Sequence, residues 1–215
     1  MLVIFLQRVR GRRCPNTQLY DLPGRGGRLE TGLGEALTAR GFTLTGRETV
    51  DEFARLSFAE QIQLVAEDLS SHFWHEDCQV VANSYGAYLF LHAQTLMPAY
   101  VGKVLLLSPI VGAFSNRGTG THFVPPRSRV LMNLVQEGKY PIPKRCEIHV
   151  GELDWQSDPD NVAALAKLTG WNMTVVRGAG HMLPKDYVGM VLDRWLIGPS
   201  DPTQKTKNTE NSAIP

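Results

Sequence analysis

The sequence predicts an α/β fold with a mainly parallel central sheet. Short apolar runs of strand length alternate along the chain with stretches whose apolar residues recur at helical spacing. Two runs, residues 80–82 and 104–107, are apolar without interruption, as is typical of strands covered by helices on both faces. We expect about six to seven strands flanked by helices on both faces, with a minimal cap domain or none.

The chain of 215 residues is long enough to bury one sizeable core. We expect one domain over residues 1–198 and a disordered polar tail over residues 199–215. No stretch approaches the roughly 18 to 20 apolar residues of a membrane span, and the apolar run at residues 2–6 is too short for a secretory signal. These features predict a cytoplasmic protein without a membrane span.

Charge and cysteine content give further expectations. The formal net charge is +1 and 20% of residues are charged, so nothing global indicates a nucleic-acid partner. Three widely spaced cysteines, Cys14, Cys78 and Cys146, are expected to be buried thiols in a reducing compartment rather than a disulfide framework. Arginines gather near the N-terminus, where they indicate either a solvated face or an anionic ligand: Arg8, Arg10, Arg12, Arg13, Arg25 and Arg28.

In the N-terminal half, strands are predicted at residues 2–6, 18–22 and 42–46. A glycine-rich loop at residues 23–28 follows the second of these strands, and a helix closed by Gly41 precedes the third. Ser57 and Glu60 form a capping box that begins a longer helix. The buried face of this helix is predicted from apolar residues at helical spacing: Ile62, Val65, Ala66, Leu69 and Phe73.

In the C-terminal half, a helix after Ser84 is expected to stop near Pro98, before the strand at 104–107. Residues 109–144 are irregular apart from one helical stretch at about 129–136, which is too little for a full cap domain. Strands are predicted at 148–150 and 173–176, with a helix closed by Gly170 between them. A final helix follows Pro184.

The glycine-rich loop at residues 23–28 fits neither phosphate-binding motif. A dinucleotide fingerprint would need a glycine where Leu29 stands, and a P-loop would need a lysine where Leu33 stands. Two interpretations stay open, a plain turn and a loop whose backbone N–H binds a reacting carbonyl oxygen.

Ser84 stands where the chain passes from a strand into a helix. Ala82 and Gly86 flank it in a small-x-Ser-x-small pattern, a variant of G-x-S-x-G in which a strained turn exposes the serine hydroxyl. We expect the turn to be so tight that the residues two before and two after the serine pass close together. The alternative interpretation is a serine that merely caps the helix.

Ser84, Asp154 and His181 each follow a predicted strand. The carboxyl ends of parallel strands meet at one edge of a sheet, so these side chains are expected to lie close together. A serine needs a histidine to take its proton and an acid to orient that histidine and stabilise its cation. Asp158 and Asp160 compete with Asp154 for the role of the acid. Asp158 precedes Pro159 at a helix start, so its side chain is already explained as an N-cap, and we favour Asp154.

The turn at Ser84 and the order Ser, Asp, His resemble the α/β-hydrolase family, and the resemblance covers essentially residues 1–198. It implies that Ser84 is the nucleophile, Asp154 the acid and His181 the general base. It also implies an oxyanion hole formed by the backbone N–H groups of Tyr85 and Arg25, with Gly26 as the alternative second donor. The sequence departs from the family at Ala82, where the turn normally has glycine, and at Pro23, where the loop often has histidine.

The resemblance implies a serine hydrolase that cleaves an ester or related acyl bond of a small substrate, without a metal or organic cofactor. His72 and His75 invite a zinc interpretation, but no further ligand group lies near them in the sequence. The main alternative is a binding protein on the same fold whose triad is idle. A further hypothesis, motivated by Arg25 and Arg28, is an anionic or peptide-linked acyl substrate.

Overall fold

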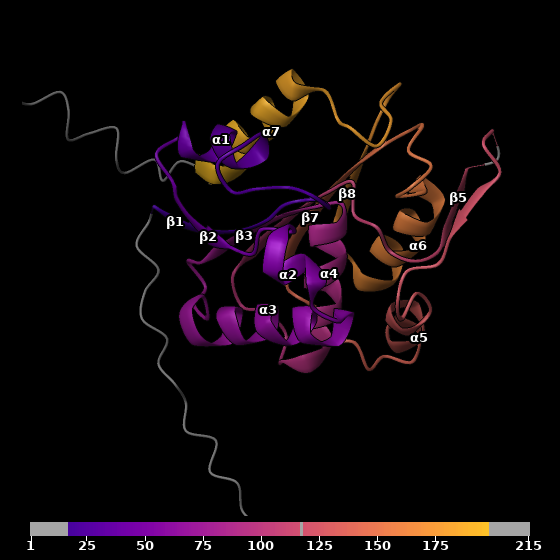
Figure 1. Cartoon of the computed structure of the whole chain (residues 1–215), viewed down its shortest axis with the longest axis horizontal. Helices are drawn as coiled ribbons and strands as arrows, with labels where there is room; N and C mark the ends of the chain where they lie inside the picture. Colours follow the sequence, from indigo (N-terminus) through magenta and orange to yellow (C-terminus); the bar gives the residue numbers. More distant parts are fainter. Residues whose placement is uncertain (1–16, 117, 198–215) are drawn as a thin grey trace, which may run out of the picture. The chain divides into compact units, whose positions relative to one another are not determined.

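The computed structural model describes residues 17–116 and 118–197, and its main sheet has six strands, all parallel, in the order β2-β1-β3-β4-β7-β8 (Figure 1). The predicted mainly parallel α/β sheet is therefore confirmed. The strands are β1 (Gln18–Leu22), β2 (Thr43–Gly46), β3 (Gln79–Asn83), β4 (Lys103–Leu107), β7 (Arg145–Gly151) and β8 (Asn172–Val176).

The direction of winding reverses at β1. The chain passes from β1 outward to β2, then returns to pair β3 with the other side of β1. Crossovers between parallel strands are right-handed, so the reversal places α1 (Leu33–Thr38) on one face of the sheet and α3 (Phe58–His72) and α4 (Tyr85–Ala93) on the other, as Figure 1 shows. The ends of β1 and β3 are neighbours at this reversal, where open α/β sheets form a ligand crevice.

The core lies between the sheet and a layer of helices in which α3 and α4 pack together, and it continues to residues of α5 (Val130–Gln136) and α6 (Pro159–Thr169). Every residue of α4 from Gly86 to Ala93 is buried, as is typical of a helix that is apolar all round. The capping box at the start of α3 is confirmed, because the Glu60 N–H donates to Ser57 Oγ and the Ser57 N–H donates to the Glu60 carboxylate. The remaining helices of this part of the chain are α2 (Asp51–Arg55) and the 3₁₀ turn η1 (Gln94–Leu96).

Between β4 and β7 the chain forms α5, close to its predicted position, and an antiparallel hairpin of β5 (Phe114–Asn116) and β6 (Thr121–Phe123). The hairpin was not predicted, because its strands have three residues each and are too short to show a strand pattern. A hairpin and one helix thus stand in place of a cap domain.

The chain divides into two compact units, one ending at Leu183 and one beginning at Pro184. Ser84, Asp154 and His181 all belong to the first unit, and the second contains α7 (Lys185–Ile197), the predicted final helix. The predicted strand at 2–6, the arginines at positions 8–13 and the predicted tail at 199–215 lie outside the described residues. Within the described ranges, no helix is both long and apolar enough to cross a membrane.

The cysteines differ from their prediction. Cys146 is a buried free thiol whose pKa is raised, first by burial and then by the nearby Glu147 carboxylate. Cys78 is disulfide-bonded, so the expectation of three unpaired thiols is wrong for this residue, and its pairing does not involve Cys146. Sequence spacing does not show which cysteines approach within bonding distance. Cysteine usage therefore gives no support to a reducing compartment.

Candidate active site

Ser84 lies between β3 and α4 with φ +52° and ψ −112°, a backbone conformation that is strained for any residue with a side chain. It occupies the N-cap position of α4, but its side chain makes no capping bond. Its Oγ lies instead 2.8 Å from Nε2 of His181. The Ser84 hydroxyl therefore faces a histidine and does not serve the helix.

Two glycines, Gly86 and Gly24, allow the backbone around the Ser84 turn to pack closely. A Cβ on Gly86 would overlap the backbone carbonyl oxygen of Leu22, and a Cβ on Gly24 would lie 3.3 Å from the Ser84 Cβ. The backbone nearest to Gly86 is that of Leu22 and Pro23, so the end of β1 requires a small residue at this position, and the expected approach of Ala82 to Gly86 stays a prediction. The crossing of β1 and α4 was not visible in the local sequence.

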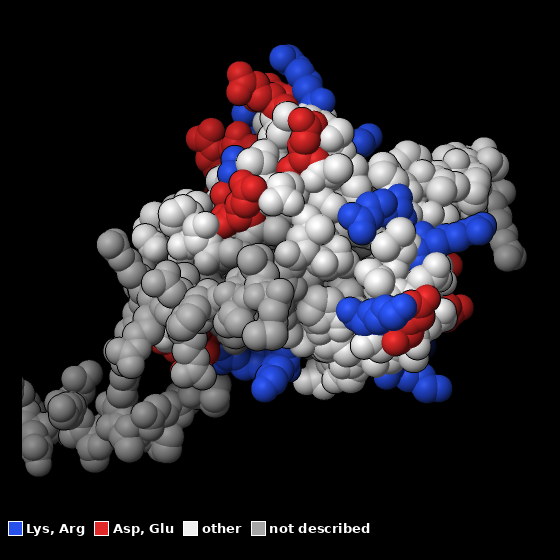
Figure 2. All heavy atoms as spheres, turned by 90° about the horizontal axis from the view of Figure 1, so that it is seen from below, with Lys and Arg blue, Asp and Glu red and all other residues white. Residues whose placement is uncertain are grey.

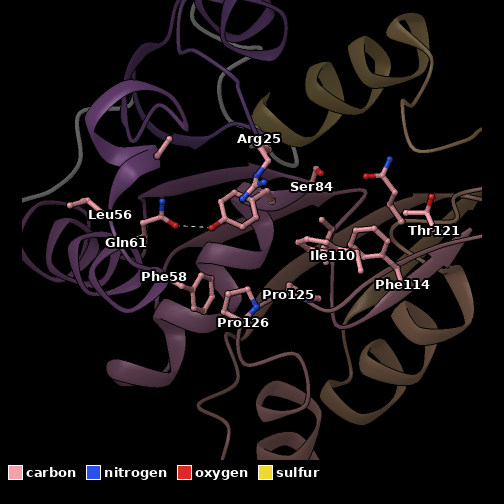
Figure 3. Close-up of a pocket in the computed structure, with 14 residues that line it drawn as sticks. Arg25, Leu56, Phe58, Gln61, Ser84, Ile110, Phe114, Thr121, Pro125 and Pro126 are labelled. Atoms are coloured by element: carbon pink, nitrogen blue, oxygen red, sulfur yellow. Dashed lines mark hydrogen bonds between the residues drawn. The ribbon is translucent and has the colours of Figure 1, made fainter.

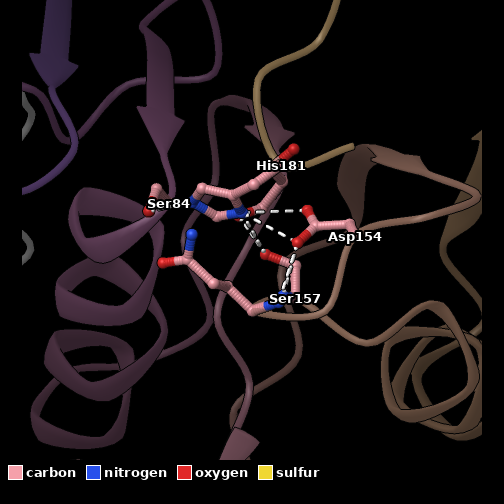
Figure 4. Close-up of polar contacts among 6 residues, drawn as sticks. Ser84, Asp154, Ser157 and His181 are labelled. Atoms are coloured by element: carbon pink, nitrogen blue, oxygen red, sulfur yellow. Dashed lines mark hydrogen bonds and ion pairs between the residues drawn. The ribbon is translucent and has the colours of Figure 1, made fainter. Parts of the chain in front are cut away.

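His181 follows β8 and joins Ser84 to Asp154 (Figure 4). Its Nδ1 lies 2.9 Å from each carboxylate oxygen of Asp154, and Asp154 is almost fully buried. With the Nδ1 proton donated to this carboxylate, Nε2 is left as the acceptor for the Ser84 hydroxyl. The structure thus brings the three predicted residues, from the ends of β3, β7 and β8, into one hydrogen-bonded series.

The Asp154 carboxylate is surrounded by donors. It accepts hydrogen bonds from the backbone N–H groups of Gln156, at 3.0 Å, and Ser157, at 2.9 Å. Burial by itself would raise the pKa of Asp154, but the hydrogen bonds from His181 and these N–H groups outweigh it and lower that pKa. The carboxylate therefore stays ionised at neutral pH and can stabilise a histidine cation.

Ser157 is a residue of the site that the sequence analysis missed. It is almost fully buried, its Oγ donates to the Ser108 carbonyl at 2.6 Å, and the same Oγ lies 3.4 Å from His181 Nδ1. Its N–H also bonds Asp154, so it links the β4 and β7 ends of the site. Its position three residues after Asp154 in a loop could have identified it, because an aspartate side chain in a turn often accepts a hydrogen bond from the backbone N–H two or three residues later.

Asp158 lies at the start of α6, as its N-cap interpretation predicted. Its carboxylate accepts from the N–H groups of Asp160, at 3.0 Å, and Asn161, at 3.2 Å. The structure therefore brings Asp154 to His181 and leaves Asp158 at the helix start.

The two implied oxyanion donors lie in backbone segments that meet beside Ser84. The N–H groups of Tyr85 and Arg25 have no hydrogen-bond acceptor within the described part of the chain. The N–H of Gly26, the alternative donor, is already bonded to the carbonyl of Thr49 at 3.2 Å. This geometry favours Arg25 over Gly26 as the second donor.

Thr49, also missed by the sequence analysis, fastens the glycine-rich loop. Its hydroxyl donates to the Gly24 carbonyl and accepts from the Gly27 N–H, which lies 3.0 Å away. Its N–H donates to the Gly27 carbonyl at 3.1 Å, and Thr49 is almost fully buried. The loop is thus a clamped structure, which is what a preorganised backbone donor requires.

A cavity of about 420 Å³ opens beside Ser84 (Figure 3). Its walls come from the glycine-rich loop, the α2–α3 region, the start of α4 and the segment that carries the β5–β6 hairpin. They are mostly apolar or aromatic, as is common for small-molecule sites. The lining residues are Arg25, Ala54, Leu56, Phe58, Gln61, Ser84, Tyr85, Ile110, Phe114, Thr121, Phe123, Pro125, Pro126 and Gln156.

The described residues give no cluster of three or more side chains that could hold a metal ion. His75, one of the two histidines weighed as zinc ligands, has its Nδ1 3.2 Å from the Asp77 carboxylate. On the face drawn in Figure 2, described basic and acidic side chains both occur, and in several places they lie next to one another. A nucleic-acid site would instead be expected to gather basic groups on one surface.

No family model matches the chain, and no curated protein matches it either. The structure, however, is similar to solved structures of α/β-hydrolases. A monoacylglycerol lipase of Paleococcus ferrophilus is 13% identical with a TM-score of 0.57, and the match covers 84% of this chain and 93% of that one. Mouse alpha/beta hydrolase domain-containing protein 10 is 11% identical with a TM-score of 0.59, covering 85% and 90%.

A third similar structure comes from work on carboxylesterases of the thaumarchaeon Nitrososphaera gargenis. It is 12% identical with a TM-score of 0.56, and the match covers 82% of this chain and 88% of that one. At such identities the likeness concerns the fold, and the chemistry has to be argued from the site itself. On this structural likeness the chain has the fold of the small α/β-hydrolases.

Proposed function

We propose that this protein is a serine hydrolase that cleaves an ester or related acyl bond of a small substrate through an acyl-Ser84 intermediate. The observation that carries the proposal is the unbroken series from Ser84 Oγ through His181 to Asp154, with contacts of 2.8 Å and 2.9 Å. A strained turn holds the serine, and a cavity opens beside it. These are the parts that nucleophilic catalysis by serine requires.

In the proposed reaction, Ser84 Oγ attacks the substrate carbonyl while His181 Nε2 takes the hydroxyl proton. Asp154 stabilises the resulting imidazolium, and the N–H groups of Tyr85 and Arg25 donate to the carbonyl oxygen as it becomes negative. His181 returns the proton to the leaving group as the bond to the carbonyl carbon breaks. Water then attacks the acyl carbon while His181 takes its proton, and the Ser84 Oγ–acyl bond breaks as His181 returns that proton to Ser84, which releases the acid.

The test is intact-mass detection of a fluorophosphonate adduct on the purified full-length protein. The Ser84 Oγ–P bond forms as the P–F bond breaks, fluoride leaves, and the serine proton passes to His181. We expect one adduct per chain in the wild type and none in Ser84→Ala or His181→Ala. Because the reagent carries its own leaving group, this test does not depend on the natural substrate.

The chain itself offers a matched control. Ser115 Oγ lies 2.7 Å from His122 Nδ1 in the β5–β6 hairpin, a contact as short as that of Ser84, but Ser115 and His122 are exposed and neither has a carboxylate partner among the described contacts. Ser115→Ala should therefore keep full labelling. A folded wild-type protein that takes up no label would contradict the proposal and favour a binding protein with an idle triad.

A further inference from the structure

Two arginines of the glycine-rich loop have opposite surroundings. Arg28 forms ion pairs with Glu48, at 3.3 Å, and Asp51, at 3.0 Å. Arg25 has no carboxylate partner among the described residues, and its guanidinium carbon lies 5.3 Å from the centre of the Tyr85 ring. The charge of Arg28 is thus balanced within the protein, whereas that of Arg25 is not.

Among the described residues that line the cavity beside Ser84, Arg25 is also the only charged one. No aspartate or glutamate belongs to the described lining. The other lining side chains are apolar, aromatic or neutral polar groups. A positive charge at the wall of an otherwise uncharged cavity attracts an anionic ligand group, because little else nearby competes for it.

Neutral polar groups accompany Arg25 on this wall. The Tyr85 hydroxyl donates to Gln61 Oε1 at 2.7 Å. Burial raises the pKa of Tyr85, and the positive charge of the nearby Arg25 offsets part of that rise. The ring and the hydroxyl beside Arg25 both belong to Tyr85, a neutral side chain that does not balance the charge of the arginine.

The cavity extends to both sides of this charged wall. In Figure 3, Gln61 and Leu56 lie to the left of Arg25, whereas Phe114 and Thr121 lie to the right of Ser84 and Ile110 lies below it. A ligand whose reacting carbonyl sits at Ser84 would thus have a charged wall on one side and an apolar wall on the other.

We propose that the substrate is an acyl ester that carries a carboxylate as well as an apolar part, and that the Arg25 guanidinium binds the carboxylate. This inference rests on the proposed hydrolase function and names its substrate class. A carboxylate fits better than a phosphate monoester, because one arginine balances one negative charge, whereas a phosphate monoester carries nearly two. The apolar walls at Phe58, Ile110 and Phe114 would hold the remainder of the molecule.

The test compares two alkyl fluorophosphonates that differ only at the far end of the alkyl chain, one ending in a carboxylate and the other in its methyl ester. A series of chain lengths from four to ten carbons covers the unknown span. The quantity measured is the ratio of the second-order labelling rate constants of Ser84 for the two reagents. At the best length we expect the carboxylate to react about three- to tenfold faster, the range of an exposed to a partly desolvated charge pair.

Arg25→Gln should bring this ratio close to one, and Arg25→Lys should keep part of it. Arg28→Gln is the matched control, an arginine from the same loop whose charge is already paired, and it should leave the ratio unchanged. Raising the salt concentration should lower the wild-type ratio. Equal rates at every chain length, or equal losses in Arg25→Gln and Arg28→Gln, would overturn the inference, whereas failure of both reagents to label Ser84 would overturn the hydrolase proposal itself.

Discussion

Asp21 and Asp154 are both almost fully buried, yet their carboxylates have opposite surroundings. Asp154 accepts two backbone N–H bonds and contacts His181, and its pKa is lowered. Neither carboxylate oxygen of Asp21 makes a hydrogen bond of normal geometry, and burial raises its pKa from 3.8 to about 7, against a lowering contribution from the nearby Leu22 N–H. Burial thus disfavours the charge of an aspartate unless donors surround it.

The difference follows from where each aspartate stands. Asp21 lies within β1 and is paired with Gly46 of β2 and Val81 of β3, so the surrounding backbone N–H groups belong to the sheet. Asp154 lies in the loop after β7, where the N–H groups of Gln156 and Ser157 have no strand partner and turn toward the carboxylate. The hydrogen bond from His181, together with the N–H groups of irregular backbone at the end of a strand, therefore keeps the proposed catalytic acid ionised.

The largest expected effect comes from removing the charge of Asp154, the member of this pair that accepts hydrogen bonds. Asp154→Asn should lower kcat on an activated ester by about 10³- to 10⁴-fold, because the histidine cation loses its stabilising partner. Asp158→Asn is the control, since asparagine caps a helix as well as aspartate does, and it should keep kcat within about twofold. A loss in Asp158→Asn with retained activity in Asp154→Asn would reverse the assignment of the acid.

The second prediction concerns Asp21 and the pH dependence of stability. Its folded-state pKa of about 7 is raised from 3.8, so its contribution to stability is fully present below about pH 4 and is lost as pH rises through 7. The size of this loss is on the order of 4 kcal/mol. Asp21→Asn should remove it, so the variant should gain unfolding free energy relative to the wild type between pH 5 and pH 8.

Urea denaturation of wild type and Asp21→Asn at a series of pH values measures this difference directly. Taking the difference between the two proteins cancels the other titrating groups. A difference that stays constant across this range would show that Asp21 is solvated in solution, and the contrast with Asp154 would then fail.

A third prediction tests whether the hydrogen bond from Ser157 Oγ to the Ser108 carbonyl holds the Ser157 N–H in place beside Asp154. Ser157→Ala keeps the N–H that bonds Asp154 but removes the hydroxyl that donates to Ser108. We expect kcat to fall about three- to tenfold with KM nearly constant, and the unfolding free energy to fall by about 1–2 kcal/mol. Unchanged kcat in a destabilised protein would assign Ser157 a purely structural role.

The smallest expected effect is in the glycine-rich loop. There the buried Thr49, unlike Asp21, has hydrogen-bond partners for its side chain. Thr49→Val keeps the volume but removes the hydroxyl that joins the Gly24 carbonyl to the Gly27 N–H. We expect kcat to fall about threefold to fivefold as the loop loosens, a part of what a whole oxyanion donor contributes. Thr49→Ser should restore most of it, and equal rates for the two variants would contradict the clamp.

Much of the fold was predictable from the sequence, because strands and helices are encoded by residues that are neighbours along the chain. The apolar run at 80–82 lies within β3, and the capping box at Ser57 begins α3 as predicted. Local patterns also located Ser84, Asp154 and His181 at strand ends, and a parallel sheet brings strand ends to one edge. The β5–β6 hairpin was missed because its pairing, rather than its composition, defines it.

The sequence by itself thus determined the α/β architecture and the residues that stand at the edge of the sheet. Only the tertiary structure decided which groups meet there. In the folded chain the Gly26 N–H is hydrogen-bonded to the Thr49 carbonyl, and Ser157 joins the site through its bond to Ser108. Arg28 forms an ion pair with Glu48, whereas the Asp21 carboxylate makes no hydrogen bond of normal geometry. Each of these outcomes depends on contacts between residues from different elements, and local patterns carry no information about such distances.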